Sequence, residues 1–169
     1  MAASLMHAIK HEATPHCQTI DTVMHDSRDR QMRALMLIEQ VASIANRSSD
    51  PSTLLKIIVE ITCIDMGFVA GNALVREGSE GEVELNGCGA AFASDAEAGA
   101  GFIEVSNRFS TWACATLPGR LLLDAVPSTL TNLQSRTNFS RHREAQAIGA
   151  QSMVATPILI DGNVAGVLE

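Results

Sequence analysis

The dipeptide Asp161-Gly162 lies between two apolar segments near the end of this 169-residue sequence. Asp-Gly favours the two-residue turn that joins neighbouring antiparallel strands. We therefore predict a hairpin whose strands are Ser152–Ile160 and residues 163–169. A hairpin of this kind needs further strands or helices to bury its apolar face, so the chain is restricted to folds built on an antiparallel sheet.

An earlier stretch of the sequence predicts a second hairpin. Residues 68–75 form a mostly apolar run, residues 78–81 have the turn sequence Gly-Ser-Glu-Gly, and residues 82–88 alternate between apolar and polar side chains. Alternation with a period of two is typical of a half-buried strand. Two hairpins strengthen the prediction of an antiparallel sheet.

Two helices are predicted ahead of these strands. The first begins at Arg28, ends at Arg47 and contains no Gly or Pro. Its apolar residues cover about half of the helix circumference, more than the roughly 100° stripe that one core face requires. We therefore expect this helix to pack against both its own sheet and a partner helix, which makes the protein a homodimer. The residues expected at the dimer interface are Leu35, Ile38, Ala42 and Ala45.

The second helix has clear start and stop signals. Asp50 can cap the free backbone N–H groups, and Pro51 occupies the first turn, where its missing N–H has no helical partner to lose. The helix is predicted to run to Met66 and to stop at Gly67. Its apolar residues indicate a core helix.

The middle of the chain has a mixed pattern. Residues 89–101 are mostly Gly, Ala, Ser and acidic residues, which predicts a mobile connection. The elements predicted after it are, in order, a strand over 102–108, a helix from Leu117 to Ala125, a strand over 130–133, and a helix over 139–148 capped by Asn138. This order of helices and hairpins indicates the α+β class, with an antiparallel sheet and helices on its faces.

The length of the chain suits one domain with a tail. Residues 1–27 carry four of the five histidines and little apolar periodicity, so we expect a partly disordered tail or a short helix there. The domain is expected over residues 28–169. Because the last residues have the pattern of a strand with no polar tail, we expect the chain to be truncated from a larger protein, whose next residues complete the sheet and lead into another domain.

Charge, hydropathy and cysteine spacing exclude several classes of protein. The net charge is −7 and no dense Lys/Arg run occurs, so we expect no nucleic-acid partner. No segment approaches the roughly 20 apolar residues of a membrane span, so we expect a cytoplasmic protein with no membrane partner. The four cysteines are scattered and form no C-x-x-C pair, which indicates neither a disulfide scaffold nor a zinc site.

Four short stretches, in their order and separation, resemble a known family. They are residues 66–74 (MGFVAGNAL), 117–120 (LPGR), 155–159 (ATPIL) and 164–169 (VAGVLE). They are similar to the GAF domains of bacterial sensor histidine kinases and diguanylate cyclases. The resemblance implies a GAF/PAS-like sheet of about six antiparallel strands, with helices on both faces and a pocket between the sheet and the middle helices.

The resemblance also implies a function. Such a domain is a sensory module of a bacterial signal-transduction protein, for example a two-component system. It binds a small-molecule ligand, passes the signal through a helical dimer interface to a C-terminal effector domain, and is not itself an enzyme. The family pattern places six residues at the pocket: Asn72, Phe102, Trp112, Cys114, Arg120 and Asn132. Arg120 is expected either to hold an anionic ligand or to act structurally as a cap or ion-pair partner.

Ligands known from relatives find little support in the residues. Many relatives have Trp and His where this chain has Phe68 and Asn72, so the ligand and any cofactor stay unknown. A bilin attached to Cys114 would require His at the next position, which is Ala115. The one histidine of the folded region, His142, lies on a helix that we interpret as solvated, and this does not favour heme. The Asn-Lys…Phe…Asp-Glu pattern of cyclic-nucleotide binders is absent.

The histidines of the tail raise the question of a metal site. His7 and His11 are spaced to share one face of a helix, and His16 follows. In so polar a tail these side chains are interpreted as solvated, because ligands without a scaffold bind metals poorly. We predict no metal site.

Two other functions stay open. A ligand-free dimerisation or spacer module would account for the broad apolar arc on the first helix. A free-methionine sulfoxide reductase would require Cys63, Cys88 and Cys114 to converge, with at least one as a thiolate. The position of Cys63 on the core face of its helix argues against the reductase. No Ser/His/Asp set or paired carboxylates occur at a recognisable spacing, so we predict no catalytic residues.

Overall fold

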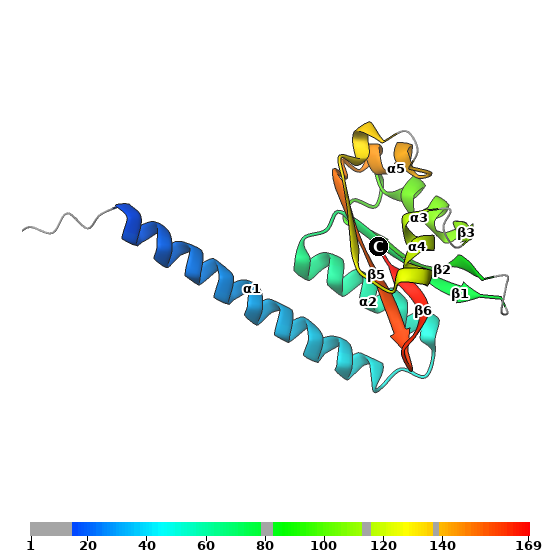
Figure 1. Ribbon diagram of the computed structural model, residues 1–169, viewed down its shortest axis with the longest axis horizontal. Coiled ribbons are helices and arrows are strands. Elements are labelled where there is room, and N and C mark those ends of the chain that lie inside the picture. The colour runs from blue at the N-terminus through cyan, green and yellow to red at the C-terminus, as the bar shows by residue number, and fades with distance from the viewer. Residues whose placement is uncertain (1–14, 79–82, 113–115, 137–138) are drawn as a thin grey trace, which may run out of the picture. The chain divides into compact units, whose positions relative to one another are not determined.

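The computed structural model describes residues 15–78, 83–112, 116–136 and 139–169, and it describes side chains from residue 27 onward, except Gln134. The chain divides into two units, residues 1–39 and residues 40–169. Helix α1 (Pro15–Ala45), the long blue and cyan helix of Figure 1, runs through the boundary between them. The helix start predicted at Arg28 is therefore wrong by 13 residues. An amphipathic pattern indicates which part of a helix can be buried but not where the helix begins, and residues 16–27 contain no Gly or Pro that would interrupt it.

The unit over residues 40–169 is built on one sheet of six strands in the order β3-β2-β1-β6-β5-β4. Every neighbouring pair of strands is antiparallel (Figure 1). The strands are β1 (Ala70–Glu77), β2 (Glu84–Ala93), β3 (Ser110–Trp112), β4 (Ser128–Thr131), β5 (Ser152–Ile160) and β6 (Asn163–Leu168). The predicted α+β class and the six-stranded antiparallel sheet are confirmed.

The hairpin predicted from Asp161-Gly162 is confirmed. Ile160 of β5 pairs with Asn163 of β6, and the two turn residues have φ values of 51° and 79°. Both angles lie in the left-handed region that a type I′ turn requires, which Asp and Gly tolerate better than other residues. The β1–β2 hairpin is also present. Residues 79–81 of its predicted turn over 78–81 lie outside the described residues.

Helix α2 (Pro51–Met66) has the predicted bounds. The Asp50 carboxylate accepts a hydrogen bond of 2.9 Å from the backbone N–H of Thr53, and Gly67 ends the helix in the left-handed conformation with φ 71°. The hydrogen bonds to Asp50 hold the pKa of its carboxyl below the usual value. Both helix ends thus have the local chemistry that the sequence indicated.

The two faces of the sheet carry different helices. Neighbouring residues of a strand point to opposite faces. Ala73 of β1 packs with Cys63 of α2, while Leu74 packs with Leu121 of helix α4 (Leu117–Asp124). Helix α2 therefore covers one face and α4 the other, and the expected helices on both faces are confirmed.

Two predictions for the middle of the chain are wrong. The connection predicted over residues 89–101 is in part strand, because β2 extends to Ala93, and the strand predicted over 102–108 is helix α3 (Ala100–Asn107). Phe102 and Ser106, four residues apart, are its buried side chains, as the helical period requires. The β-branched Ile103 and Val105 suggested a strand, but packing against β2 decides the conformation, since local propensity is weak.

In the last part of the chain, the short 3₁₀ helix η1 (Leu133–Ser135) precedes helix α5 (His142–Ala147). The helix is shorter than the predicted 139–148, and Arg141 is its N-cap residue. The predicted cap, Asn138, lies outside the described residues. Helix α4 is confirmed, with Thr116 as its cap: the Thr116 hydroxyl accepts a hydrogen bond of 3.2 Å from the Gly119 N–H.

Candidate functional site

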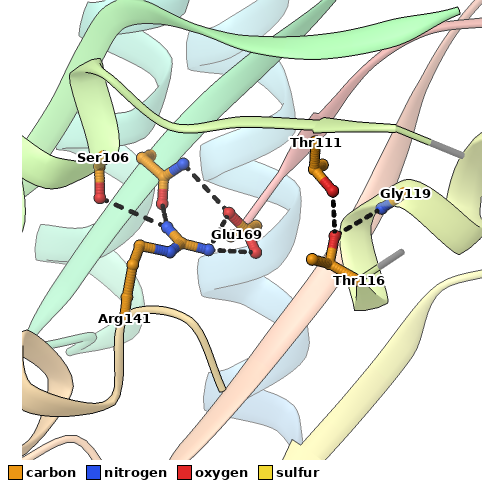
Figure 2. A network of polar contacts seen from close by, with 7 residues as sticks. Ser106, Thr111, Thr116, Gly119, Arg141 and Glu169 are labelled. Atoms are coloured by element: carbon orange, nitrogen blue, oxygen red, sulfur yellow. Dashed lines mark hydrogen bonds and ion pairs between the residues drawn. The ribbon is translucent and has the colours of Figure 1, made fainter. Parts of the chain in front are cut away.

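Arg141 is the largest of the fully buried side chains, with 1% of its surface exposed. Its Nη2 donates to both carboxylate oxygens of Glu169, at 2.8 and 2.7 Å. Its Nη1 donates to the Asn72 amide oxygen at 3.0 Å and to the Ser106 hydroxyl at 3.3 Å (Figure 2). The Asn72 amide nitrogen donates in turn to Glu169 at 3.1 Å. These four residues form one buried polar network.

Three aromatic rings surround the guanidinium group of Arg141. Its central carbon lies 4.5 Å from the ring centroid of Phe109, 5.5 Å from that of Phe139 and 5.9 Å from that of Phe102. These distances are within the range of cation–π interactions. The Nε–H of Arg141 is buried and has no hydrogen-bond partner among the described residues. One strong donor of this network is therefore unused.

The network connects segments that are far apart in the sequence. Asn72 lies in β1, and Glu169 follows the last residue of β6. The two residues exchange both backbone hydrogen bonds, at 3.0 and 2.9 Å. Sheet pairing thus brings the amide and the carboxylate together, and Arg141 reaches them from the start of α5 (Figure 2).

Two hollows border Arg141. The first, which we call the apolar cavity, has a volume of about 210 Å³. Most of its lining is apolar and comes from α2, the first residues of β1 and β5, and α5: Val59, Thr62, Cys63, Phe68, Val69, Ala70, Asn72, Phe102, Leu133, Phe139, Arg141, Ala145, Ile148, Ala150, Ser152, Met153, Val154, Thr156, Leu168 and Glu169.

Two strand edges border the apolar cavity. In an antiparallel ladder, every second residue directs its N–H and C=O to the same side. Since Asn72 bonds to Glu169, Ala70 also directs its backbone groups toward the line of β6. On the other side, Leu168, the last residue of β6, pairs with Thr156 of β5. Val154 lies two residues before Thr156, so it also directs its backbone groups toward the line of β6. Both Ala70 and Val154 line the cavity, so its lining includes residues from the starts of two strands.

The second hollow, which we call the arginine hollow, has a volume of about 260 Å³ and a largely polar lining. It lies between the start of α4, β4 and the segment that leads into α5. The described residues that line it include three arginines and no acidic residue: Phe109, Thr116, Leu117, Pro118, Arg120, Leu130, Arg136, Phe139, Ser140 and Arg141. Arg141 thus borders both hollows.

The structure brings three of the six predicted pocket residues to these hollows. Asn72 and Phe102 line the apolar cavity, and Arg120 lines the arginine hollow. Trp112 lies on the edge strand β3 with 53% of its surface exposed, and Asn132 is exposed at the start of η1; neither lines either hollow. Cys114 lies outside the described residues. Whether the three residues at the hollows contact a ligand stays a prediction.

The centre of the site lies on a segment that the sequence predicts to be solvated. Arg141, Arg143 and Glu144 are charged neighbours of His142, a pattern typical of an exposed helix face. Arg143 is exposed as expected, but Arg141 is buried. His142 is half-buried, and its Nδ1 lies 3.2 Å from the Leu133 carbonyl oxygen. No local signal identifies Arg141, because its partners are 28 to 69 residues away in the chain.

The cysteines that the structure describes offer little for thiol chemistry. Burial raises the pKa of the Cys63 thiol from its ordinary value near 9 to about 11, so the thiolate is disfavoured. The Cys88 thiol donates to the Ala73 carbonyl oxygen at 3.4 Å. No group of three or more His, Cys, Asp or Glu among the described residues is placed to hold a metal ion. Within the same residues, no helix has the length and apolar character to cross a membrane.

No family model matches this chain, and no curated protein matches it. Solved structures do match. The GAF domain of nlh2 from A. aeolicus, in a crystal structure of an inactive state, superposes with a TM-score of 0.63 at 13% identity, over 82% of this chain and 78% of that one. The GAF domain of a phosphoenolpyruvate-protein phosphotransferase from Coxiella burnetii has a TM-score of 0.59 at 17% identity, over 81% and 76%.

The corresponding domain of an Acinetobacter phosphoenolpyruvate-protein phosphotransferase has a TM-score of 0.55 at 20% identity, over 81% of this chain and 75% of its own. These identities are low, so the similarity concerns the fold. The chain has the fold of a GAF domain, and the resemblance inferred from its sequence is confirmed at that level.

Proposed function

We propose that this chain is a sensory domain of a larger bacterial signalling protein, such as a sensor histidine kinase or a diguanylate cyclase. It binds a small molecule in the arginine hollow, between the sheet and α4. The observation that carries this proposal is the position of Arg141. Its side chain borders the hollow and forms a buried ion pair with Glu169. Several polar groups converge on this hollow, which makes it our candidate site for a small regulatory ligand.

The network supplies a route from the hollow to the sheet. A ligand that favours one position of the Arg141 side chain also favours one arrangement of Glu169 and Asn72, at the end of β6 and on β1. The shift cannot exceed the difference in binding free energy between the two arrangements. This supports a relay from ligand to β6.

Helix α1 supports the proposed homodimer. Leu35, Ile38, Ala42 and Ala45 follow one another at spacings of three, four and three residues, which is the pattern of a coiled-coil seam. All four are exposed on the single chain, Leu35 by 62% and Ile38 by 64%. An unpaired apolar seam on a 31-residue helix suits a partner helix from a second copy.

A native mass spectrum of the purified protein, recorded before and after incubation with a mixture of cell metabolites, tests the proposal. We expect a dimer that carries added mass after incubation. Dimers that stay bare under these conditions would favour the alternative of a ligand-free dimerisation module, for which the exposed seam of α1 is the supporting observation. Bare monomers would contradict both functions.

A further inference from the structure

We propose that the arginine hollow binds a small organic anion, held through a carboxylate or phosphate group by Arg120 and Arg136. This inference rests on the proposed sensory function and specifies the chemistry of its ligand.

The distribution of charge is the first argument. The protein is acidic, with a net charge of −7, and only eight of its lysines and arginines lie in residues 40–169. Three of these eight line a single hollow, whose described lining has no acidic residue. This concentration of positive charge favours an anion in the hollow.

The ion pairs of the three arginines are the second argument. The charge of Arg141 is matched by Glu169 at 2.7 Å. Arg120 and Arg136 form no ion pair with any carboxylate that the structure describes. Arg136 donates its Nε–H to the Thr131 carbonyl oxygen at 2.9 Å, which positions the side chain without neutralising it. The hollow thus keeps two positive charges.

The buried Nε–H of Arg141 is the third argument. A buried donor without an acceptor destabilises the folded state unless an acceptor reaches it. Arg141 borders the arginine hollow, and an oxyanion bound there supplies acceptor atoms of the kind that the guanidinium edge prefers. Because Arg141 lies in the same lining as Arg120 and Arg136, its unpaired donor favours an anionic ligand over a neutral one.

The rest of the lining limits the body of the ligand. Phe109, Phe139 and Leu130 supply apolar surface, and Ser140 supplies a hydroxyl group. The hollow of about 260 Å³ lies below the usual range for drug-sized ligands. The ligand is therefore a small metabolite with at least one anionic group and a short apolar part.

Calorimetric titration of the whole chain at low ionic strength tests the inference. The probes are inorganic phosphate, succinate, citrate and a short-chain acyl phosphate, each up to about 10 mM, which is about ten times the upper end of typical enzyme KM values. The variants are Arg120→Gln and Arg136→Gln. The matched control is Arg143→Gln, which removes the same charge from an exposed residue that does not line the hollow.

We expect at least one anion to bind the wild-type chain, and each of the two variants to weaken it about tenfold or more, because a charge-assisted hydrogen bond is lost. The control variant should bind as the wild type does, and added salt should weaken binding. Equal losses in all three variants, or no binding of any anion, would overturn the inference.

Native mass spectra of the same samples separate this result from the proposed function. If the protein captures a neutral metabolite and no anion, the anionic ligand is wrong and the sensory function stands. If it captures neither, both are wrong. A thermal unfolding curve of each variant shows that the fold is retained, which is expected because Arg120 is exposed and Arg136 only half-buried.

Discussion

The side chains of Arg141 and Glu169 are 1% and 2% exposed, so their charged groups are almost completely removed from water. Desolvation of such a pair costs several kcal/mol, which the contact between the charges and the additional hydrogen bonds must offset. The hydrogen bonds to Asn72 and Ser106 and the three aromatic rings supply those additional contacts. We therefore expect the pair to fix the geometry of the site more than it adds net stability.

Removing one partner of this pair should be severe. We expect Arg141→Met to lower the free energy of unfolding by about 3–5 kcal/mol, because the Glu169 carboxylate is left buried and unpaired. The double variant Arg141→Met/Glu169→Met should lose less than the sum of the single variants, since no lone charge remains. Urea unfolding at neutral pH measures all three.

The exposed ion pair between Arg108 and Glu104 provides the control. These side chains are 79% and 60% exposed, and their nitrogen and oxygen lie 3.0 Å apart. Arg108→Gln should cost no more than about 1 kcal/mol. If Arg141→Met costs as little as this control, the buried pair does not hold α5 to the sheet.

Cys63 gives a prediction about alkaline pH. Its pKa rises from near 9 to about 11 on folding, because burial disfavours the thiolate. Between these two values the unfolded chain has lost the proton that the folded chain still holds. The free energy of unfolding should therefore fall as the pH rises from 9 to 11. The slope, from urea unfolding at a series of pH values, should be smaller in Cys63→Ala; an unchanged slope would assign the effect to other groups.

The environment of single side chains was the feature that the sequence predicted least well. Asn72 and Phe102 were placed at a pocket by family pattern, and both line a cavity. The burial of Arg141 could not be inferred, because it depends on a carboxylate 28 residues later and an amide 69 residues earlier. Burial of an arginine is a property of its partners, and those partners come together only in the folded sheet.

Elements were predicted best where their ends have specific chemistry. The cap at Asp50, the left-handed Gly67 and the turn at Asp161-Gly162 all gave correct boundaries, since these residues act on their immediate neighbours. Helix α3 was predicted wrongly, because its helical state is decided by contact with β2. Gly87 of β2 is part of that contact: a Cβ there would meet the Ser106 carbonyl oxygen.

The packing of α2 on the sheet depends on Gly71. A Cβ at this position would lie 2.6 Å from the Cys63 sulfur and 3.1 Å from the Glu169 carbonyl oxygen. We expect Gly71→Ala to lower the free energy of unfolding by about 1–3 kcal/mol, as in overpacked cores. Adding Cys63→Ala removes the sulfur from the contact and should recover part of the loss. Chemical denaturation measures both variants.

Gly101 offers a control for the glycine substitution. It lies inside α3, and a Cβ there would meet nothing within 4 Å. Gly101→Ala should raise the free energy of unfolding by about 0.5–1 kcal/mol, since alanine favours helices more than glycine does. If Gly71→Ala is as harmless as Gly101→Ala, the close approach of α2 to β1 is not required for stability.

At the scale of the whole molecule, the seam on α1 predicts the oligomeric state. We expect Leu35→Glu and Ile38→Glu to convert the dimer to a monomer without loss of helical circular dichroism, because a buried charge at the seam is costly. Sedimentation velocity measures the mass. Met36→Glu is the control, since residue 36 is equally exposed but lies on the opposite side of the helix from this seam. A dimer that survives both seam variants would exclude this interface.

The buried ion pair between Arg141 and Glu169 also has a consequence for evolution. A chain that loses either residue passes through a state with one buried, unmatched charge, so positions 141 and 169 should change together across descendants of this sequence, either as a charged pair or as two apolar residues. Asn72, which bonds to both, should follow them. Such covariation of the three positions would be detectable in an alignment before any ligand is known. Its strength would measure how strongly selection has preserved the contact between the arginine hollow and the end of β6.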